Sequence, residues 1–460
     1  MRRFYAVLIC AVLISAAMVS CEESVELDYL TGGEVAGWPY GSDEPDEPEN
    51  PDDPNNPDNP DDPNDPNNPD EPENPDDPNN PDVPDIPGGD DSSRVLLMYF
   101  VGTSLDSDFG RNIAAAKSVM SPDVTGNGSI VYFRRQSGSE WAIRRIALNE
   151  AGVAEDIVLK TYPDADLTDM RFFLSEMIRF APAESYGLVF GGHGTGWLPK
   201  NVGLTMSSTY SVGGGGSYIA PFGELPREDA LPTRFFGESK VIFDVGEIAE
   251  NMISTGAKFD FLIFDDCFMS NIEALYAMRH AVDYIIASPC EVMAAGFPYD
   301  CILPYIFADG GCDLAGVCRA FYEYYMYDYS IHSGCVALTV CSELDALAEA
   351  YRNLAAGAVK PVDVSKLQYY EGLAKHLFYD FGQYAGLLSA NPMLLNDFRE
   401  QFDRAFPPKC RLNTPSFYSA FGSRYLIDID YYSGVTISEP ADRNEQDNRQ
   451  TEWYRATHMW

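Results

Sequence analysis

The sequence predicts an α/β fold: a mainly parallel β-sheet with helices on both faces and an extension at the carboxyl end. Short apolar runs at residues 94–101, 186–190 and 259–264 are typical of strands that are buried on both faces. Stretches with apolar residues at helical spacing lie between these runs. Such alternation of strands and helices is typical of parallel sheets, whose crossover connections contain helices.

Residues 93–460 number 368, which is enough for a large hydrophobic core. We expect a core over about 93–342 and an extension, packed on it without a site of its own, over about 343–460. The predicted core elements, in chain order, are strand 94–101, helix 109–119, strand 129–134 with hairpin partner 141–148, helix 167–180, strands 186–190 and 259–264, a helix from 272, and strands 281–288 and 335–340. The predicted extension elements are helices 344–355 and 393–406 and short strands near 425–429 and 434–437.

Cys267 stands in a turn between a strand and a helix. The apolar run 259–264 stops at Asp265-Asp266-Cys267, and Ser270 with Glu273 matches a capping box that would start a helix. Ligand sites of open α/β sheets lie at this edge of the sheet, and a helix amino terminus favours the nucleophilic thiolate. The alternative is a buried structural cysteine.

A glycine cluster surrounds His193 at the end of an earlier strand. The cluster, Gly191-Gly-His193-Gly-Thr-Gly196-Trp197, matches neither the dinucleotide-binding pattern GxGxxG nor the phosphate loop. Glycines allow close backbone approach and expose N–H groups. Neighbouring parallel strands lie about 4.8 Å apart, so that an imidazole and a thiol at the ends of two such strands could face one point. Nucleophilic catalysis by a thiol requires that geometry.

Several motifs together resemble the clostripain-like cysteine peptidases, which are related to the gingipains and legumains. They are Phe190-Gly-Gly-His193-Gly-Thr-Gly-Trp197, Asp265-Asp-Cys267-Phe-Met269, and the stretch from Asp283 to Ser288 through Gly296-Phe-Pro-Tyr299. The resemblance covers most of residues 94–460. It implies a caspase-like fold and a cysteine endopeptidase. A rival hypothesis is a surface-binding lipoprotein on the same scaffold, with its catalytic pair idle.

The resemblance also implies roles for four residues. His193 would be the general acid and base, Cys267 the nucleophile, and the N–H groups of Gly194 and Cys267 the oxyanion hole. Asp265 would lie in the specificity pocket and pair with a substrate Lys or Arg, although Asp265 could instead cap its turn. Ala295 departs from the family pattern, because an acidic residue commonly precedes the glycine of the Gly-Phe-Pro-Tyr stretch.

A long polar segment, residues 200–240, lies between His193 and Cys267. Loops of this length are usually functional or disordered. The resemblance implies self-cleavage in this region, and the alternative is a passive surface loop. The basic residues at which self-cleavage could occur are Lys200, Arg227, Arg234 and Lys240.

The first 20 residues predict a signal peptide, because a basic start precedes an uncharged apolar stretch. Small residues before Cys21 resemble the lipobox of bacterial lipoproteins, in which the cysteine is lipidated and becomes the mature amino terminus. Residues 21–41 would then be a lipidated segment of an exported protein, at the bacterial outer membrane or cell surface. The alternative is an ordinary cleaved signal with a coincidental cysteine.

Residues 42–92 are a predicted linker. Proline recurs at every third position from Pro45 to Pro87, which favours an extended polyproline II rod. At about 3.1 Å per residue, those 43 residues could span on the order of 130 Å. The linker has no Lys or Arg, and its charges repel one another. A calcium-binding repeat would need Gly turns and spaced ligands, which the linker lacks.

The charge of the chain argues against a nucleic-acid partner, and the spacing of its cysteines argues against a zinc site. The linker carries 20 acidic residues, half of the formal net charge of −40, and the rest of the chain is still acidic. We therefore expect peptide or protein substrates and no nucleic acid. Eight cysteines remain outside the signal region, with no zinc-like spacing. We predict no metal site and no required cofactor, while a calcium requirement stays open.

Overall fold

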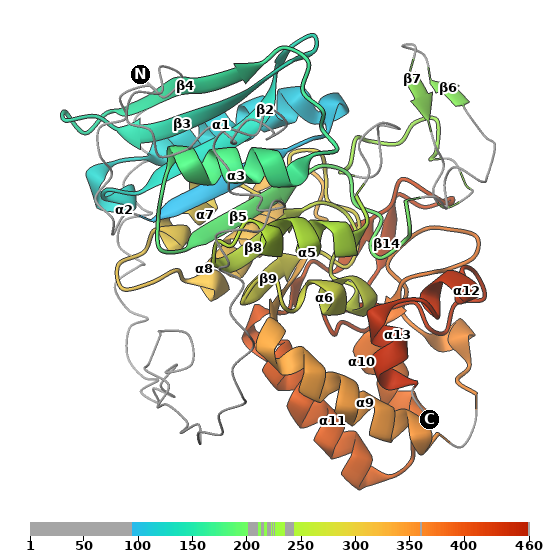
Figure 1. Ribbon diagram of the computed structural model, residues 1–460. Coiled ribbons are helices and arrows are strands. Elements are labelled where there is room, and N and C mark those ends of the chain that lie inside the picture. The colour runs from blue at the N-terminus through green and yellow to red at the C-terminus, as the bar shows by residue number, and fades with distance from the viewer. Residues whose placement is uncertain are drawn as a thin grey trace, which may run out of the picture. The chain divides into compact units, whose positions relative to one another are not determined.

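The computed structural model describes residues 94–200, 210–212, 216–218, 222, 224, 226–234, 243–358 and 361–458 (Figure 1). The predicted signal peptide, the segment 21–41 with Cys21, the linker 42–92 and Lys240 lie outside the described residues.

The core is one nine-stranded sheet, and its central block of five strands is parallel. Strands are paired antiparallel only towards its two edges. In spatial order the strands are β12 (Leu412–Asn413), β10 (Cys335–Val340), β9 (Tyr284–Ala287), β8 (Phe259–Asp265), β5 (Tyr186–Gly191), β1 (Val95–Phe100), β2 (Ser129–Ser137), β3 (Glu140–Leu148) and β4 (Ala154–Tyr162). This arrangement confirms the predicted α/β class with a mainly parallel sheet.

Helices cover both faces of the sheet, which explains why β1 and β5 are buried along their whole length. Figure 1 shows α3, α5 and α6 on the near face and α1, α7 and α8 behind it. The bounds of these helices are α1 (Asp106–Val119), α3 (Met170–Phe180), α5 (Val245–Ser254), α6 (Ile272–Met278), α7 (Tyr299–Ile306) and α8 (Leu314–Glu323).

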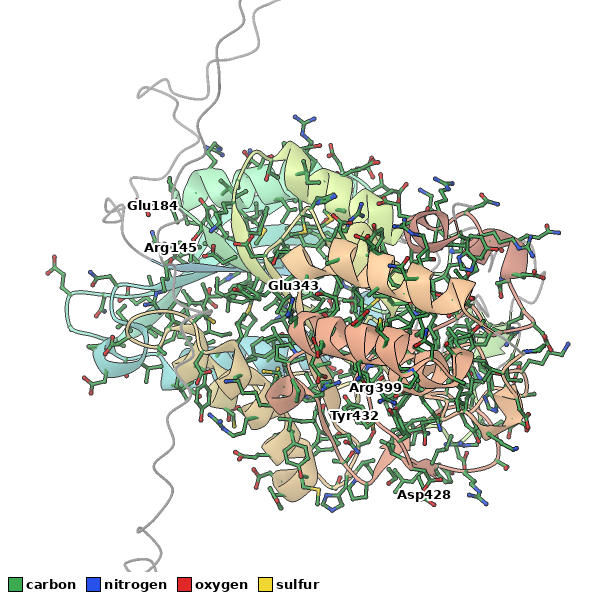
Figure 2. The ribbon with its side chains drawn as sticks, turned by 90° about the horizontal axis from the view of Figure 1, so that it is seen from below. Arg145, Glu184, Glu343, Arg399, Asp428 and Tyr432 are labelled. Carbon is green, nitrogen blue, oxygen red and sulfur yellow. The ribbon has the colours of Figure 1, made fainter. Side chains whose placement is uncertain are left out.

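The carboxyl-terminal extension packs on the α6 side of the core through α9 (Leu344–Ala356) and α13 (Glu452–Thr457). Trp453 of α13 packs edge-on against Tyr276 of α6, with ring centroids 5.5 Å apart. Gln401 of α11 donates to Glu343, just before α9, at 2.8 Å. Glu343 is labelled in Figure 2, beside helices of the extension. The remaining elements of the extension are α10 (Phe381–Leu388), α11 (Pro392–Ala405), α12 (Glu445–Asn448) and the short strands β11 (Tyr379–Asp380), β13 (Ser416–Tyr418), β14 (Leu426–Asp428) and β15 (Thr436–Ile437).

All predicted core strands and helices are present, with ends shifted by a few residues, and β4 is a strand that we did not predict. The predicted capping box at the start of α6 is wrong by one residue. Asn271 is the N-cap, and its side chain accepts a hydrogen bond from the Ala274 N–H at 3.2 Å. The Ser270 hydroxyl instead donates to the Gly434 carbonyl at 2.7 Å, because the extension reaches this turn.

Candidate active site

The His193 loop and the Cys267 turn lie side by side. Strands β5 and β8 are parallel neighbours, with Gly191 opposite Asp265, so that His193 and Cys267 each follow the carboxyl end of a strand at the same sheet edge. A Cβ atom on Gly194 would lie 2.2 Å from the Cys267 carbonyl oxygen. Only glycine allows the two backbones to approach this closely.

Cys267 lies in a constrained turn and is fully buried. Phe268, the next residue, has a φ of 62°, in the left-handed region that most side chains avoid. Its ring stacks on Phe378 with centroids 5.0 Å apart, which holds this conformation. Burial, together with the nearby Glu291 carboxylate, raises the pKa of the Cys267 thiol well above its ordinary value. The Val292 N–H, 3.2 Å from the sulfur, opposes this shift only in part.

His193 is half-buried and contacts the loop that follows β1. Its Nε2 atom forms a hydrogen bond with the Ser104 hydroxyl at 2.7 Å. A Cβ atom on Gly102 would lie 3.3 Å from the imidazole Cδ2 atom, so the glycine leaves room for the ring. The sequence carried no signal that pointed to Ser104, because this residue lies 89 positions before the histidine.

A segment of the chain itself crosses this site in an extended conformation. Thr233 forms an antiparallel β-bridge with Met293. On either side of the bridge, the Arg234 N–H donates to the Val292 carbonyl at 2.7 Å and the Ala294 N–H donates to the Pro232 carbonyl at 3.0 Å. Extended peptides bind to exposed strand edges through this kind of main-chain pairing.

The carbonyl oxygen of Arg234 lies between the two N–H groups that we predicted as an oxyanion hole. The Gly194 N–H and the Cys267 N–H each donate to this oxygen at 3.2 Å. The predicted donor pair therefore faces one carbonyl oxygen next to Cys267.

The side chain of Arg234 fills a closed pocket and is fully buried. Its guanidinium lies 3.0 Å from the Asp265 carboxylate, donates to Asn112 Oδ1 at 2.6 Å and lies over the Phe109 ring, 5.0 Å from the ring centroid. Burial is the largest single effect on Arg234 and by itself would lower its pKa. The Asp265 carboxylate, together with Tyr299, Tyr325 and Asp266, outweighs burial and raises the pKa above its ordinary value. The guanidinium is therefore charged in this pocket.

Asp265 is held rigidly at the end of this pocket. Its carboxylate accepts hydrogen bonds from the Tyr299 hydroxyl at 2.6 Å and from the Phe297 N–H at 3.2 Å. Burial raises the pKa of the Asp265 carboxyl, while Arg234, Tyr299 and the Phe297 N–H act in the opposite direction.

Two further residues complete the pocket wall. Gly296 has a φ of 69°, and a Cβ atom there would lie 2.1 Å from the Arg234 guanidinium, so a side chain at this position would close the pocket. The Ala295 carbonyl accepts from Asn112 at 2.8 Å. Where the family pattern commonly has a second acidic residue, this pocket therefore has an amide from α1, which the sequence did not predict.

The other basic residues of the 200–240 segment that the structure describes make different contacts. Lys200 forms an ion pair with Glu247. The Arg227 guanidinium donates to the Phe421 carbonyl at 2.9 Å and stacks on the Tyr425 ring at 4.0 Å. Of Lys200, Arg227 and Arg234, only Arg234 reaches Asp265.

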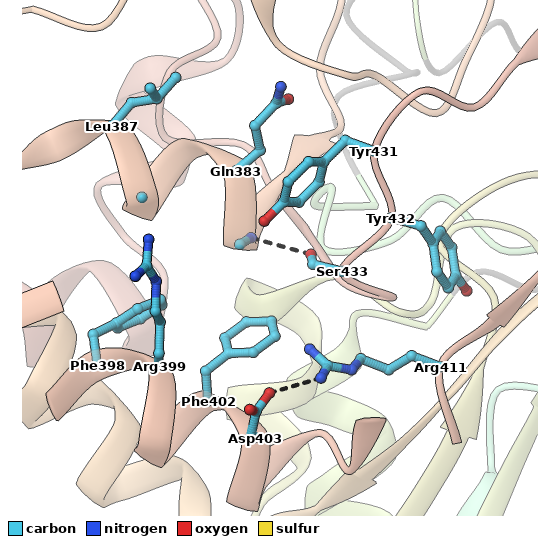
Figure 3. Close-up of a pocket in the computed structure, with 12 residues that line it drawn as sticks. Gln383, Leu387, Phe398, Arg399, Phe402, Asp403, Arg411, Tyr431, Tyr432 and Ser433 are labelled. Atoms are coloured by element: carbon cyan, nitrogen blue, oxygen red, sulfur yellow. Dashed lines mark hydrogen bonds and ion pairs between the residues drawn. The ribbon is translucent and has the colours of Figure 1, made fainter. Parts of the chain in front are cut away.

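A separate pocket of about 430 Å³ lies in the extension, between α10, α11 and residues 431–433 (Figure 3). Phe402 and an ion pair between Arg411 and Asp403, 2.6 Å long, form part of its wall. None of the predicted site residues lines it. Within the described part of the chain, no group of three or more His, Cys, Asp or Glu residues is arranged to hold a metal ion.

The chain is similar to known proteins in sequence and in fold. The clostripain family model, peptidase C11, matches residues 236–459. The chain is also similar to the crystal structure of a secreted C11 cysteine protease, "iotapain", from Bacteroides thetaiotaomicron. The sequence identity is 31%, the TM-score is 0.69, and the match covers 80% of this chain and 99% of that chain. No curated protein matches.

Two other crystal structures have similar folds. One is an inactive zymogen of a C11 protease from Parabacteroides distasonis, with 28% identity, a TM-score of 0.65, and coverage of 81% of this chain and 100% of that chain. The other is a secreted C11 cysteine protease from Bacteroides thetaiotaomicron in complex with an irreversible peptide inhibitor, with a TM-score of 0.65. The sequence identity is 24%, and the match covers 80% of this chain and 99% of that chain. At this identity the similarity supports the fold alone.

Proposed function

The chain belongs to the clostripain family of cysteine proteases, and from this premise we propose that it is an endopeptidase with a Cys267–His193 dyad that cuts after Arg or Lys. We further propose that the bond after Arg234 is its own first substrate. The observation that carries both proposals is the Arg234 carbonyl oxygen, which accepts hydrogen bonds from Gly194 and Cys267 at 3.2 Å.

In the proposed reaction, His193 removes the proton of the Cys267 thiol and the sulfur attacks the carbonyl carbon of Arg234. The negative charge on the carbonyl oxygen is stabilised by the N–H groups of Gly194 and Cys267. The C–N bond to Phe235 then breaks, and His193 returns the proton to the leaving amine. Water hydrolyses the resulting thioester and restores the thiol.

The proposal explains why the site is closed in this state. The 232–234 segment covers Cys267, and burial raises the pKa of its thiol, which disfavours the thiolate. Cleavage after Arg234 would allow the segment to leave, and an outside peptide with a basic residue could then take its place. An intact chain would thus be a self-blocked precursor.

We also propose that the protein is exported and anchored through a lipid on Cys21. The signal-like residues 1–20 and the resemblance to a secreted protease support export. In the part of the chain that the structure describes, no helix is both long and apolar enough to cross a membrane.

The test is self-cleavage of the purified chain. We expect the wild type to yield two fragments, the first ending at Arg234, and Cys267→Ala, His193→Ala and Arg234→Ala to remain single chains. Arg234→Lys should still be cut, because an ammonium can also pair with Asp265. Lys200→Ala is the matched control and should be processed like the wild type, since Lys200 contacts Glu247. Gel electrophoresis shows whether each chain is cut, and mass spectrometry shows where the first fragment ends. Cleavage of Cys267→Ala, or a first fragment that ends at a residue other than Arg234, contradicts the proposal.

A further inference from the structure

Glu291 is a buried carboxylate beside the proposed cleavage site that the mechanism above does not use. It is 1% exposed and precedes residues 292–294, whose backbone pairs with residues 232–234. A carboxylate buried this deeply requires hydrogen-bond partners, so the contacts of its two oxygens identify its role.

One carboxylate oxygen is held by the extension. Oε1 of Glu291 accepts from the Ser419 hydroxyl at 2.8 Å and from the Ala420 N–H at 2.8 Å. The Ser419 hydroxyl oxygen also accepts from the N–H groups of Gly372 and Phe421, at 3.0 and 3.2 Å, so its proton is directed at Glu291. The side chain of Glu291 is thereby fixed in one orientation.

The other oxygen faces the residue before Arg234. Oε2 of Glu291 lies 2.9 Å from the Thr233 hydroxyl. Successive side chains of an extended segment point to opposite sides, so Thr233 points away from the pocket of Asp265 that holds Arg234. The two side chains therefore contact two different carboxylates.

A hydroxyl suits this position in either protonation state of the carboxyl. Burial raises the pKa of Glu291 to about 7, so the neutral and charged forms coexist near neutral pH. A hydroxyl can donate to the carboxylate or accept from the carboxylic acid. Valine, which has the shape of threonine, can do neither and would leave a buried oxygen unpaired. Thr233 is also nearly enclosed, at 8% exposure, which disfavours a long side chain.

We propose that Glu291, oriented by Ser419 and Ala420, is a specificity-determining residue that selects substrates with Thr or Ser directly before the basic residue. The inference rests on the proposed function. It narrows the substrate class to peptides in which Thr or Ser directly precedes the Arg or Lys after which the enzyme cuts.

The test compares fluorogenic peptides that differ only at this position: Leu-Pro-Thr-Arg, Leu-Pro-Ser-Arg, Leu-Pro-Val-Arg and Leu-Pro-Lys-Arg. For the self-processed wild type we expect kcat/KM for the Thr and Ser peptides to exceed that for the Val peptide by about tenfold or more, because the site is built to bind a hydroxyl. Glu291→Ala should bring the Thr-to-Val ratio close to one. Glu291→Gln should keep part of it, since the amide oxygen still accepts a hydrogen bond.

The ratio separates a specificity role from a structural one, because damage to the fold lowers turnover of all four peptides alike. Three results overturn the inference and leave the proposed function standing. The wild type turns over the Thr and Val peptides equally, or it prefers the peptide with Lys directly before Arg, or the Thr-to-Val ratio is unchanged in Glu291→Ala. Failure of the wild type to cut any Arg peptide overturns the proposed function and the inference with it. Within the chain, Thr233→Val should slow self-cleavage about tenfold, and Thr233→Ser should not.

Discussion

At the scale of single residues, one buried charge pair dominates the site. Asp265 and Arg234 are both fully buried and lie 3.0 Å apart. Removing one partner of such a pair leaves the other charge buried without compensation, which typically costs about 2–5 kcal/mol. Tyr299 and the Phe297 N–H also donate hydrogen bonds to this carboxylate, in addition to its ion pair with Arg234. The pocket is therefore organised in advance for a cation.

The prediction at this scale concerns specificity. Asp265→Asn should lower kcat/KM for peptides with Arg or Lys before the cut by tens-fold or more, given about 1.4 kcal/mol per factor of ten. Peptides with Ala or Leu at this position should be affected far less, and the melting temperature serves as the control for folding. A wild-type enzyme that prefers Ala, Leu or Phe before the cut contradicts our assignment of Asp265.

At the scale of secondary-structure elements, the helix that follows Cys267 joins the core to the extension. Glu273 of α6 is buried, and its carboxylate accepts from the Ser438 N–H at 2.8 Å and from the Asn448 side chain at 3.0 Å. Burial raises the pKa of Glu273 from the ordinary 4.5 to about 7, and these hydrogen bonds reduce the shift only in part. The buried carboxylate of α6, the helix that follows Cys267, thus obtains its hydrogen bonds from residues more than 160 positions later in the chain.

The sign of this shift gives a prediction about stability. The folded-state pKa lies above the unfolded value, so the contribution of Glu273 to the free energy of unfolding is full below about pH 4.5 and is lost as the pH rises through about 7. The loss is on the order of 3 kcal/mol, at about 1.4 kcal/mol per pKa unit. Glu273→Gln should abolish this part of the pH dependence.

Denaturant unfolding at pH 5 and pH 8 measures this loss of stability in the protein with Glu273 and in Glu273→Gln. Both proteins carry Cys267→Ala to prevent self-cleavage. Because Glu291 and other groups titrate in both proteins, the quantity to compare is the difference between them. An equal loss of stability from pH 5 to pH 8 in both proteins would show that Glu273 does not carry the effect.

At the scale of the whole molecule, the acidic, proline-rich residues 42–92, which we predict to be a linker, lie in the sequence between the proposed anchor at Cys21 and the protease. Charge repulsion and the polyproline II preference both extend such a linker. From the sequence we predict that such a linker would affect how well the protease reaches large protein substrates.

The prediction at this scale concerns anchoring. Cys21→Ser should move the protein from the membrane fraction to the soluble fraction, because the proposed lipid is then absent. Turnover of small peptides should stay unchanged, since the substitution lies far along the chain from the site. Cell fractionation with immunoblotting measures the distribution, and a Cys21→Ser protein that stays with membranes contradicts the lipobox hypothesis.

Local patterns in the sequence predicted much of the core. Apolar runs identified the strands β1, β5, β8 and β10, because a strand buried on both faces must be apolar along its length. The sequence also suggested that His193 and Cys267 could follow neighbouring parallel strands, and the register of β5 and β8 shows that these strands are such neighbours. The N-cap of α6 was misassigned, since two neighbouring polar residues, Ser270 and Asn271, both suit that position.

The sequence alone determined the fold class and the family, and it indicated the sheet edge of the candidate site, because these depend on periodicity and on motifs that are short along the chain. Only the tertiary structure decided that Asn112 and Ser104 come to the site from the start of the core, that Arg234 fills the pocket of Asp265, and that the extension orients Glu291 through Ser419. The physical reason is that these contacts join segments separated by 31 to 128 residues, and side-chain packing, which leaves no trace in local spacing, brings them together.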